Sequence, residues 1–269
     1  MIGAAAMETL SLELDPPIAT GATADIHAWR DGQVLKLYRT TIPRSVGPRE
    51  ARITRALHDA GARVPRVGDL VEVNRRFGLP MEKLSGEPLS LQLVDAESGT
   101  RAGFIAAEVH VEMHALTAES LTALPVQFRK MIEAGTLSPE RKERVLRAME
   151  SLPDGDRICH GDFHAGNLMM TDDGPVVIDC VVAHRGNPLA DVAQTCVAMT
   201  EWLYFRMSER SREAVARFIE SYERRYFELS PGGRDEMAMW KPIVAAVRFS
   251  APHPPSSEAP LLNMVDGHR

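Results

Sequence analysis

The 269-residue sequence has only three cysteines, Cys159, Cys180 and Cys196, and they are widely spaced. An odd number of distant cysteines without a Cys-x-x-Cys pair argues against a disulfide framework and fits a reducing compartment. No apolar run approaches the roughly 20 residues that a membrane span requires. The N-terminus also lacks the basic and long apolar regions of a signal peptide. These absences predict a cytoplasmic protein with no membrane partner.

The sequence also lacks a surplus of basic residues, with 31 Lys and Arg against 37 Asp and Glu. Because a net negative chain repels phosphate backbones, we expect no nucleic-acid partner. The acidic surplus is strongest between residues 91 and 179. Such a stretch favours a cationic substrate, but a solvated acidic helix face explains it equally well.

The N-terminal third has the pattern of an antiparallel sheet that carries one helix. Residues 24–29 and 34–38 are short strand-like runs, and the Asp-Gly between them favours a hairpin. A helix that begins near Pro48 and ends before Gly61 interrupts the strands, which resume at residues 67–81.

The pattern becomes helical after residue 86. Residues 101–116 have helical periodicity, and a second helix should begin at Ser138-Pro139, with Ser138 as its N-cap. Residues 188–249 are also typical of helices, whereas we expect the proline-containing tail after residue 251 to be irregular. The fold class is therefore α+β, with a small sheet lobe followed by a larger, mainly helical lobe.

One loop combines the residue types that phosphoryl transfer requires. Residues 160–167 read His-Gly-Asp-Phe-His-Ala-Gly-Asn, and the apolar run 176–178 leads into Asp179. In this pattern Asp162 can reach a substrate hydroxyl, while the oxygens of Asn167 and Asp179 can ligate a metal ion. Phosphoryl transfer needs an acidic group that orients the hydroxyl and oxygen ligands for Mg²⁺. The sequence therefore predicts a phosphoryl-transfer site.

The motif resembles that of the aminoglycoside phosphotransferase and choline kinase-like superfamily, which comprises small-molecule kinases with a protein-kinase-like bilobal fold. The resemblance covers nearly the whole chain and extends through Leu35-Lys36, the helix of Glu50, residues 185–191 and residues 240–248. It implies a nucleotide-binding lobe and hinge at residues 1–86, and a catalytic and substrate-binding lobe at residues 87–269.

The resemblance implies a role for each matching residue. Asp162 would be the catalytic base, and Asn167 and Asp179 would hold Mg²⁺. Lys36 would contact the α- and β-phosphates of ATP and would be held in place by Glu50. The alternative for Lys36 is an edge-strand lysine that extends into solvent. The alternative for Glu50 is a glutamate that the helix dipole favours at a helix start.

The same resemblance places the rest of the nucleotide. The loop that contains Gly21 and Thr23 would cover the phosphates, although it lacks the full Gly-x-Gly-x-x-Gly pattern. Main-chain groups of Glu82 and Leu84 would meet the purine at the hinge. ATP is the expected cofactor together with Mg²⁺, and GTP is left open.

Four further residues qualify this picture. His160 would pack beneath the catalytic loop, and Asp191 would brace it. The chain departs from the family pattern at Ala165, where relatives often have proline, and at Cys180, where an aromatic residue is usual. The first change could loosen the loop, and the second could alter packing beside Asp179.

The expected partner is a small hydroxylated molecule, bound by a monomer or weak dimer. An aminoglycoside or other cationic antibiotic is the first candidate, which would imply antibiotic resistance. An endogenous amino alcohol, a sugar or a fructosamine-type metabolite stays open. For a polycationic acceptor, we expect acidic side chains of the last three helices to line the pocket, with these candidates: Glu201, Glu209, Glu220 and Glu223.

Two other classes of function are compatible with parts of this pattern. A non-catalytic nucleotide-binding protein of the same fold is disfavoured, because the residues needed for catalysis are present. In a zinc hydrolase, His160 and His164, with Asp162 between them in the sequence, would bind the metal, and a third ligand would come from Asp179, His184 or His114. The zinc alternative leaves Lys36, Glu50 and Asn167 unexplained.

Overall fold

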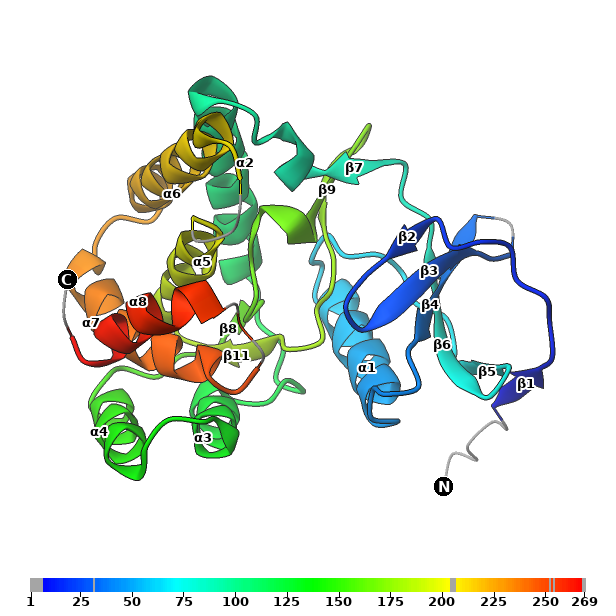
Figure 1. Ribbon diagram of the computed structural model, residues 1–269, viewed down its shortest axis with the longest axis horizontal. Coiled ribbons are helices and arrows are strands. Elements are labelled where there is room, and N and C mark those ends of the chain that lie inside the picture. The colour runs from blue at the N-terminus through cyan, green and yellow to red at the C-terminus, as the bar shows by residue number, and fades with distance from the viewer. Residues whose placement is uncertain (1–6, 31, 204–206, 252, 254, 268–269) are drawn as a thin grey trace.

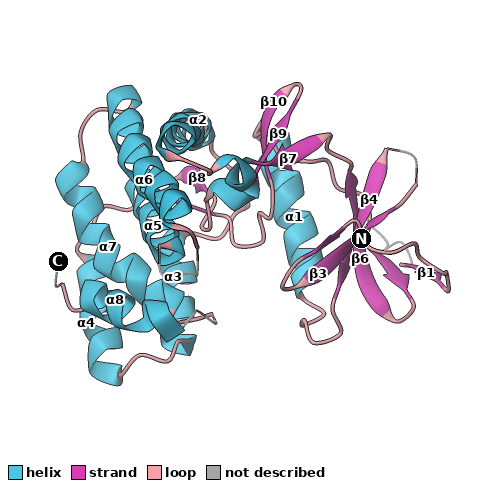
Figure 2. Ribbon diagram, turned by 45° about the horizontal axis from the view of Figure 1, so that its top comes forward, coloured by secondary structure: helices cyan, strands magenta, loops and turns pink. Residues whose placement is uncertain are grey.

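The computed structural model describes residues 7–30, 32–203, 207–251, 253 and 255–267. Figures 1 and 2 show the large sheet at one end of the molecule and the long helices at the other, with helix α1 between them. No helix in the described part of the chain is long and apolar enough to cross a membrane.

The N-terminal strands form one six-stranded sheet in the order β1-β5-β6-β4-β3-β2. These strands are β1 (Glu8–Leu10), β2 (Ala19–Thr20), β3 (Ala24–Ala28), β4 (Gln33–Tyr38), β5 (Val71–Val73) and β6 (Arg76–Glu82). Neighbouring strands are antiparallel except β1 and β5, which pair in parallel at one edge. The expected β3–β4 hairpin is confirmed, although Asp31 in its turn lies outside the described residues.

Helix α1 (Val46–Asp59) connects the sheet to the rest of the protein. Its Ala51 belongs to a small apolar cluster with Leu79 of the sheet. Its Ile53 and Leu57 instead join the large apolar core of the C-terminal part. Because α1 packs on both sides, Glu50 in its second turn is buried between the two parts of the molecule.

The C-terminal part is mainly helical, and it contains two small sheets. One has the strand order β10-β9-β7, and the other pairs β11 with β8. The strands are β7 (Gly86–Pro88), β8 (Arg157–Cys159), β9 (Leu168–Thr171), β10 (Gly174–Val177) and β11 (His184–Gly186). The short 3₁₀ helices are η1 (Leu89–Gln92) and η2 (Ala165–Asn167). The α-helices are α2 (Ala96–His114), α3 (Leu124–Ala134), α4 (Pro139–Glu150), α5 (Pro188–Trp202), α6 (Glu209–Leu229), α7 (Arg234–Arg248) and α8 (Pro255–Val265).

The structure contains most of the elements that the sequence predicts and differs from the prediction at one of them. The α+β bilobal class is confirmed, and Ser138 caps α4 by accepting a hydrogen bond from the Arg141 N–H. The prediction of an irregular tail is wrong, because α8 begins at Pro255. Proline is tolerated at the first helical position, where its missing N–H has no partner to lose. Burial of Leu261 and Val265 then fixes one face of α8.

Helices α2 and α6 approach each other closely at two glycines. A Cβ atom on Gly103 would lie 2.6 Å from the main-chain oxygen of Phe218, and one on Gly99 would overlap the main chain at Ala214. Neither neighbour is a flexible side-chain end that could move aside. These glycines therefore set the helix separation and the position of α6 relative to the core.

We predict that Gly103→Ala destabilises the protein by about 1–3 kcal/mol, because overpacking outweighs the better helix propensity of alanine. Urea unfolding monitored by circular dichroism measures the change. Arg101→Ala on the exposed face of α2 is the control and should change stability by less than about 0.5 kcal/mol. A Gly103→Ala protein as stable as the wild type would contradict this account of the α2–α6 contact.

Candidate active site

Lys36 joins the N-terminal sheet to the C-terminal part through two carboxylates. Its Nζ lies 2.7 Å from Glu50 Oε1 and 2.9 Å from Asp179 Oδ1. The Tyr38 hydroxyl donates to the second oxygen of Glu50 at 2.7 Å. Lys36 and Tyr38 are two residues apart on β4 and therefore point to the same face of the sheet. The three residues Lys36, Glu50 and Asp179, predicted to act at one site, do converge.

The charges in this cluster support one another. Burial alone would lower the pKa of Lys36, but the carboxylates of Glu50 and Asp179 raise it above its usual value. The lysine is therefore a fixed positive charge at neutral pH. Burial and the adjacent Glu50 carboxylate raise the pKa of Tyr38, so its hydroxyl stays protonated and remains a donor.

Asp162 lies in the loop that follows β8. Burial would raise its pKa, but His164 and Arg248 lower it, so the carboxylate is ionised. The distances are 3.7 Å from Asp162 Oδ2 to His164 Nε2 and 3.4 Å from Asp162 Oδ1 to Arg248 Nη1. An ionised carboxylate with part of its surface accessible can accept a hydrogen bond from a substrate hydroxyl.

Asn167 and Asp179 present oxygen ligands that fit a magnesium ion. The Nδ2 group of Asn167 donates to the main-chain oxygen of Asp162 at 2.9 Å, which leaves the amide oxygen to bind a cation. Asp179 has a positive φ of 59°, a conformation that aspartate tolerates better than most residues. Its Oδ1 is bound to Lys36, while almost half of the side chain is exposed. Carboxylate and amide oxygens are suitable Mg²⁺ ligands.

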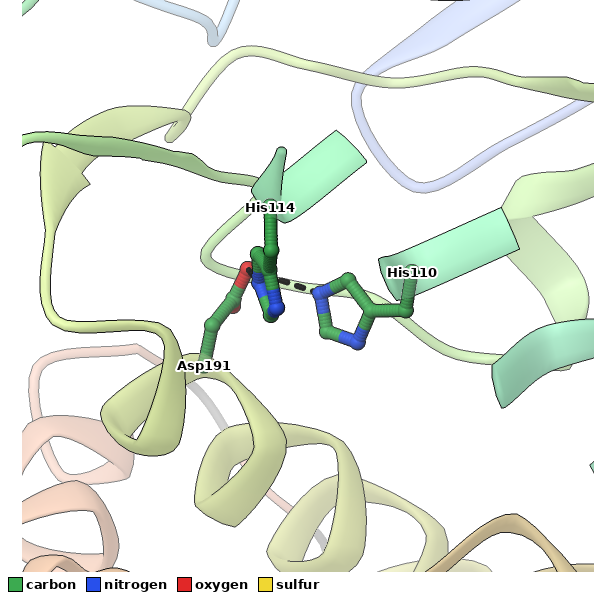
Figure 3. Close-up of side chains that lie close together, drawn as sticks. All are labelled: His110, His114 and Asp191. Atoms are coloured by element: carbon green, nitrogen blue, oxygen red, sulfur yellow. Dashed lines mark hydrogen bonds and ion pairs between the residues drawn. The ribbon is translucent and has the colours of Figure 1, made fainter. Parts of the chain in front are cut away.

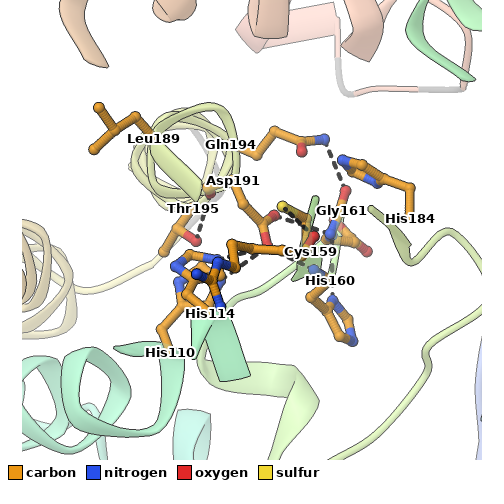
Figure 4. A network of polar contacts seen from close by, with 12 residues as sticks. His110, His114, Cys159, His160, Gly161, His184, Leu189, Asp191, Gln194 and Thr195 are labelled. Atoms are coloured by element: carbon orange, nitrogen blue, oxygen red, sulfur yellow. Dashed lines mark hydrogen bonds and ion pairs between the residues drawn. The ribbon is translucent and has the colours of Figure 1, made fainter. Parts of the chain in front are cut away.

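Asp191, at the start of α5, is bonded to the main chain of the loop that contains Asp162 (Figure 4). One of its oxygens accepts the N–H of His160 at 2.5 Å, and the other accepts the N–H of Gly161 at 2.9 Å. The His160 ring in turn bonds the main-chain oxygen of Ile178 at 3.0 Å and thereby ties the loop to the segment before Asp179. These contacts agree with the expected bracing role of Asp191 and with His160 packing beneath the loop.

Two histidines of α2 complete the shell around Asp191 (Figure 3). His110 Nε2 lies 2.9 Å and His114 Nε2 lies 3.3 Å from the same Asp191 oxygen. The Nδ1 atoms lie 2.7 Å from the hydroxyls of Tyr222 and Tyr226 on α6. Burial lowers the pKa of His110 to about 3, so the ring is neutral and donates from Nε2 while the tyrosine donates to Nδ1. Burial opposes the charge on Asp191, yet the two histidines lower its pKa well below the usual value.

Among the described residues, the ligands that a zinc hydrolase would need do not converge on one site. His160 is committed to Ile178, while His114 is committed to Asp191. Among the described residues, the one group with metal-holding proximity is His110, His114 and Asp191. Each of its ring nitrogens already has a hydrogen-bond partner, which is the arrangement of a buried polar network rather than of a metal centre.

The loop of Gly21 and Thr23 joins β2 to β3 and is held by Arg39. The Gly21 N–H donates to the Ala24 oxygen at 2.9 Å, which closes a tight turn. The Arg39 guanidinium donates to the Gly21 oxygen at 3.0 Å, and the Arg39 N–H donates to the Thr23 oxygen at 2.9 Å. The loop thus has a defined shape beside β4, the strand that carries Lys36.

The hinge follows β6. The Glu82 N–H donates to the Arg66 oxygen at 2.8 Å, and the Lys83 N–H donates to the Gly32 oxygen at 2.9 Å. The N–H of Glu82 is therefore not available to a purine. Among the described residues, the main chain of Leu84 has no hydrogen-bond partner, so its groups can meet a base.

Both departures from the family pattern are buried. Ala165 is fully enclosed at the start of η2. Cys180 packs beside Asp179 and is 1% exposed. Burial and the nearby Glu50 and Asp179 carboxylates raise the pKa of the Cys180 thiol, so it acts as a small apolar side chain.

The four glutamates expected to line the acceptor pocket lie in different parts of the structure. Glu201 is buried and accepts a hydrogen bond from Arg248 Nε at 2.6 Å. Because Arg248 also contacts Asp162, Glu201 is connected to Asp162 through one intervening side chain. Glu220 pairs with Arg217 on the surface, and Glu223 lies 3.0 Å from Arg234. The remaining candidate, Glu209, is exposed at the start of α6. Within the part of the chain that the structure describes, Glu201 is the one of the four that is linked to the loop of Asp162, through Arg248.

Sequence reasoning missed two contributors to the site. Tyr38 could have been found, because it follows Lys36 by two residues on one strand and shares its face. Arg248 gives no such signal, since an arginine near a helix C-terminus is common for electrostatic reasons alone. Only the packing of α7 against the loop of Asp162 shows that Arg248 reaches Asp162.

Comparisons with known proteins agree on one family of folds. The model of the family described as "Phosphotransferase enzyme family" matches residues 17–240. Among solved structures, aminoglycoside-3'-phosphotransferase of type VIII is similar, with 21% identity, coverage of 87% of this chain and 93% of that chain, and a TM-score of 0.59. No curated protein matches the chain in sequence.

Two further structures have the same fold. An amicoumacin kinase in complex with AMP-PNP, Ca²⁺ and Ami shares 14% identity, with coverage of 92% of this chain and 86% of that chain and a TM-score of 0.61. A choline/ethanolamine kinase family protein from Mesorhizobium loti shares 16% identity, with coverage of 95% and 81% and a TM-score of 0.57.

We predict that Asp191→Asn lowers the free energy of unfolding by about 3 kcal/mol or more, because an amide cannot accept from all the N–H groups that converge on the carboxylate. Chemical unfolding measures this change. Asp172→Asn, in an exposed turn, serves as the matched control and should leave stability unaltered. Equal stability of the two variants would show that the network around Asp191 contributes little.

Proposed function

The chain belongs to the phosphotransferase enzyme family, and on that premise we propose that it transfers the γ-phosphoryl group of ATP to a hydroxyl of a small molecule. The observation that carries this proposal is the convergence of two sets of residues. Lys36, Glu50 and Asp179 meet in one ion cluster. The Asn167 amide is held against the main chain of Asp162 in the adjacent loop.

Asp162 is the proposed catalytic base. Because it is ionised, it can accept the hydrogen bond of the acceptor hydroxyl and orient that oxygen toward the phosphorus atom. Asp191 and His160 hold the loop main chain, so the carboxylate is positioned before the substrate binds. Orientation of this kind is a major source of rate enhancement in phosphoryl transfer.

Residues 1–86 are proposed to bind the nucleotide, with residues 87–269 supplying catalysis and the acceptor site. Lys36 would bind the α- and β-phosphates, beneath the loop of Gly21 and Thr23. Asn167 and Asp179 would hold Mg²⁺, which neutralises negative charge on the phosphates when bound. The amicoumacin kinase complex, which holds AMP-PNP and Ca²⁺, supports a nucleotide and a divalent cation for this fold.

The first candidate acceptor is an aminoglycoside or another cationic antibiotic. The similarity to aminoglycoside-3'-phosphotransferase of type VIII supports it, as does the acidic stretch between residues 91 and 179. The choline/ethanolamine kinase family protein supports an endogenous amino alcohol as the alternative. Sugars and fructosamine-type metabolites belong to the same alternative class.

We predict that Asp162→Asn lowers the rate of phosphoryl transfer by about 10²- to 10⁴-fold, because an amide cannot act as the base. Nucleotide binding should be retained, since Asp162 is not among the residues assigned to ATP. Acceptor-stimulated ADP formation and calorimetric titration with a non-hydrolysable ATP analogue measure the two effects. Transfer at the wild-type rate by Asp162→Asn would refute the assignment of the base and favour a binding function without catalysis.

A further inference from the structure

The two oxygens of the Asp162 carboxylate face different surroundings. Oδ2 lies toward His164, whose ring contacts the Asn167 amide at 3.3 Å, so this oxygen is on the side of the metal ligands. Oδ1 faces Arg248 of α7. A hydroxyl that is to be phosphorylated must reach this carboxylate, and the acceptor molecule therefore lies beside the Arg248 guanidinium.

Arg248 is fixed by a buried partner. Its Nε donates to Glu201 Oε2 at 2.6 Å, and Glu201 is 3% exposed. The Arg248 side chain itself is 30% exposed. Within the described ranges no residue accepts from Nη2. A guanidinium is planar, so a bond from Nε to a rigid carboxylate fixes the orientation of the whole group and leaves its outer edge available.

This ion pair differs from the others that join helices of the C-terminal part. Arg234–Glu223 and Arg225–Glu108 connect helices through side chains that are substantially exposed. Glu201 is instead withdrawn from water, which costs free energy that only its ion pair and hydrogen bonds can offset. The Arg248 guanidinium joins α5 to α7 through Nε, and its Nη1 also contacts Asp162. The second contact is not required for joining the two helices.

The position of Arg248 has a consequence for the acceptor. Arg248 is paired with two carboxylates, Glu201 and Asp162, so what it offers an acceptor is the N–H groups of its free edge. An ammonium group has only donors and cannot form a hydrogen bond with that edge. A carboxylate or carbonyl oxygen at the same place would accept from the free edge of the guanidinium. The arrangement therefore favours an electronegative neighbour of the hydroxyl over a cationic one.

We propose that Arg248, held by Glu201, is the specificity-determining residue that binds a carboxylate or carbonyl oxygen next to the hydroxyl that is phosphorylated. This inference rests on the proposed kinase function and narrows its acceptor class. Charge elsewhere on the acceptor is not restricted. An amine attached directly beside the reacting hydroxyl is disfavoured.

Matched pairs of compounds test the proposal. One pair is glycerate and 3-amino-1,2-propanediol, and a second is glucuronate and 6-amino-6-deoxyglucose. In each pair a carboxylate group is replaced by an aminomethyl group while the neighbouring hydroxyls are kept. Binding is measured by calorimetry in the presence of Mg²⁺ and AMP-PNP, and turnover is measured by ADP formation from ATP.

For the wild-type protein we expect the carboxylate member to bind at least about tenfold more tightly than the amine, because a hydrogen bond to a charged group is lost in the amine. Arg248→Met should abolish this preference and leave the KM for ATP unchanged. Arg248→Lys should retain part of it, since the charge stays but the planar fork is lost. Glu201→Gln should weaken it, because the guanidinium is no longer fixed.

Arg234→Met is the matched control, because Arg234 lies at the other end of α7 and also pairs with a glutamate. It should behave as the wild type in every assay. Thermal unfolding checks that each variant is folded. If Arg248→Met does not fold, the comparison is made with Arg248→Lys.

Three results would overturn the inference: a preference that Arg248→Met leaves intact, tighter binding of the amine, or equal or undetectable binding of both members of each pair. Failure of the proposed function has a different signature. In that case the wild-type protein would show no Mg²⁺-dependent binding or turnover of ATP, with or without acceptor.

Discussion

The buried ammonium of Lys36 is the constraint on which the arrangement of the site depends. A lysine this deep in a protein needs compensating negative charge, and the two carboxylates that provide it come from distant parts of the chain. Glu50 belongs to α1, which packs between the sheet and the helical core, and Asp179 follows β10 in the C-terminal part. Satisfying one lysine therefore fixes the sheet, the helix and the segment of Asp179 relative to one another.

A second buried charge, on Asp191, organises the loop of Asp162 in the same way. It gathers N–H groups from the loop and from two histidines of α2. The histidines are held by tyrosines of α6, and glycines of α2 allow α6 to approach that closely. The helical part thus supplies a rigid base for Asp162, while the Lys36 cluster supplies the opposite wall. The two networks meet where His160 bonds to Ile178, immediately before Asp179.

The sequence predicted the parts of this site that depend on short-range patterns. The loop around Asp162 and Asn167 is local, and Asp179 follows it after one hairpin, so spacing alone indicated their chemistry. The resemblance to small-molecule kinases linked Lys36 to Glu50, a pairing that the structure contains. Arg248 could not be predicted, because it lies 86 residues from Asp162 and only tertiary packing brings the two together. The tail helix differs for another reason: prolines usually interrupt helices, but Pro255 occupies the first position of α8, where proline is favoured.

The central claim is that this chain moves a phosphoryl group from ATP to a small-molecule hydroxyl. Mass spectrometry of reactions with Mg²⁺, ATP and a panel of aminoglycosides, peptide antibiotics, amino alcohols, sugars and hydroxy acids tests it most directly. We predict that compounds of one class gain the mass of a single phosphoryl group, with an equal amount of ADP formed. ATP consumption that yields only inorganic phosphate, with every panel compound unmodified, would contradict the account.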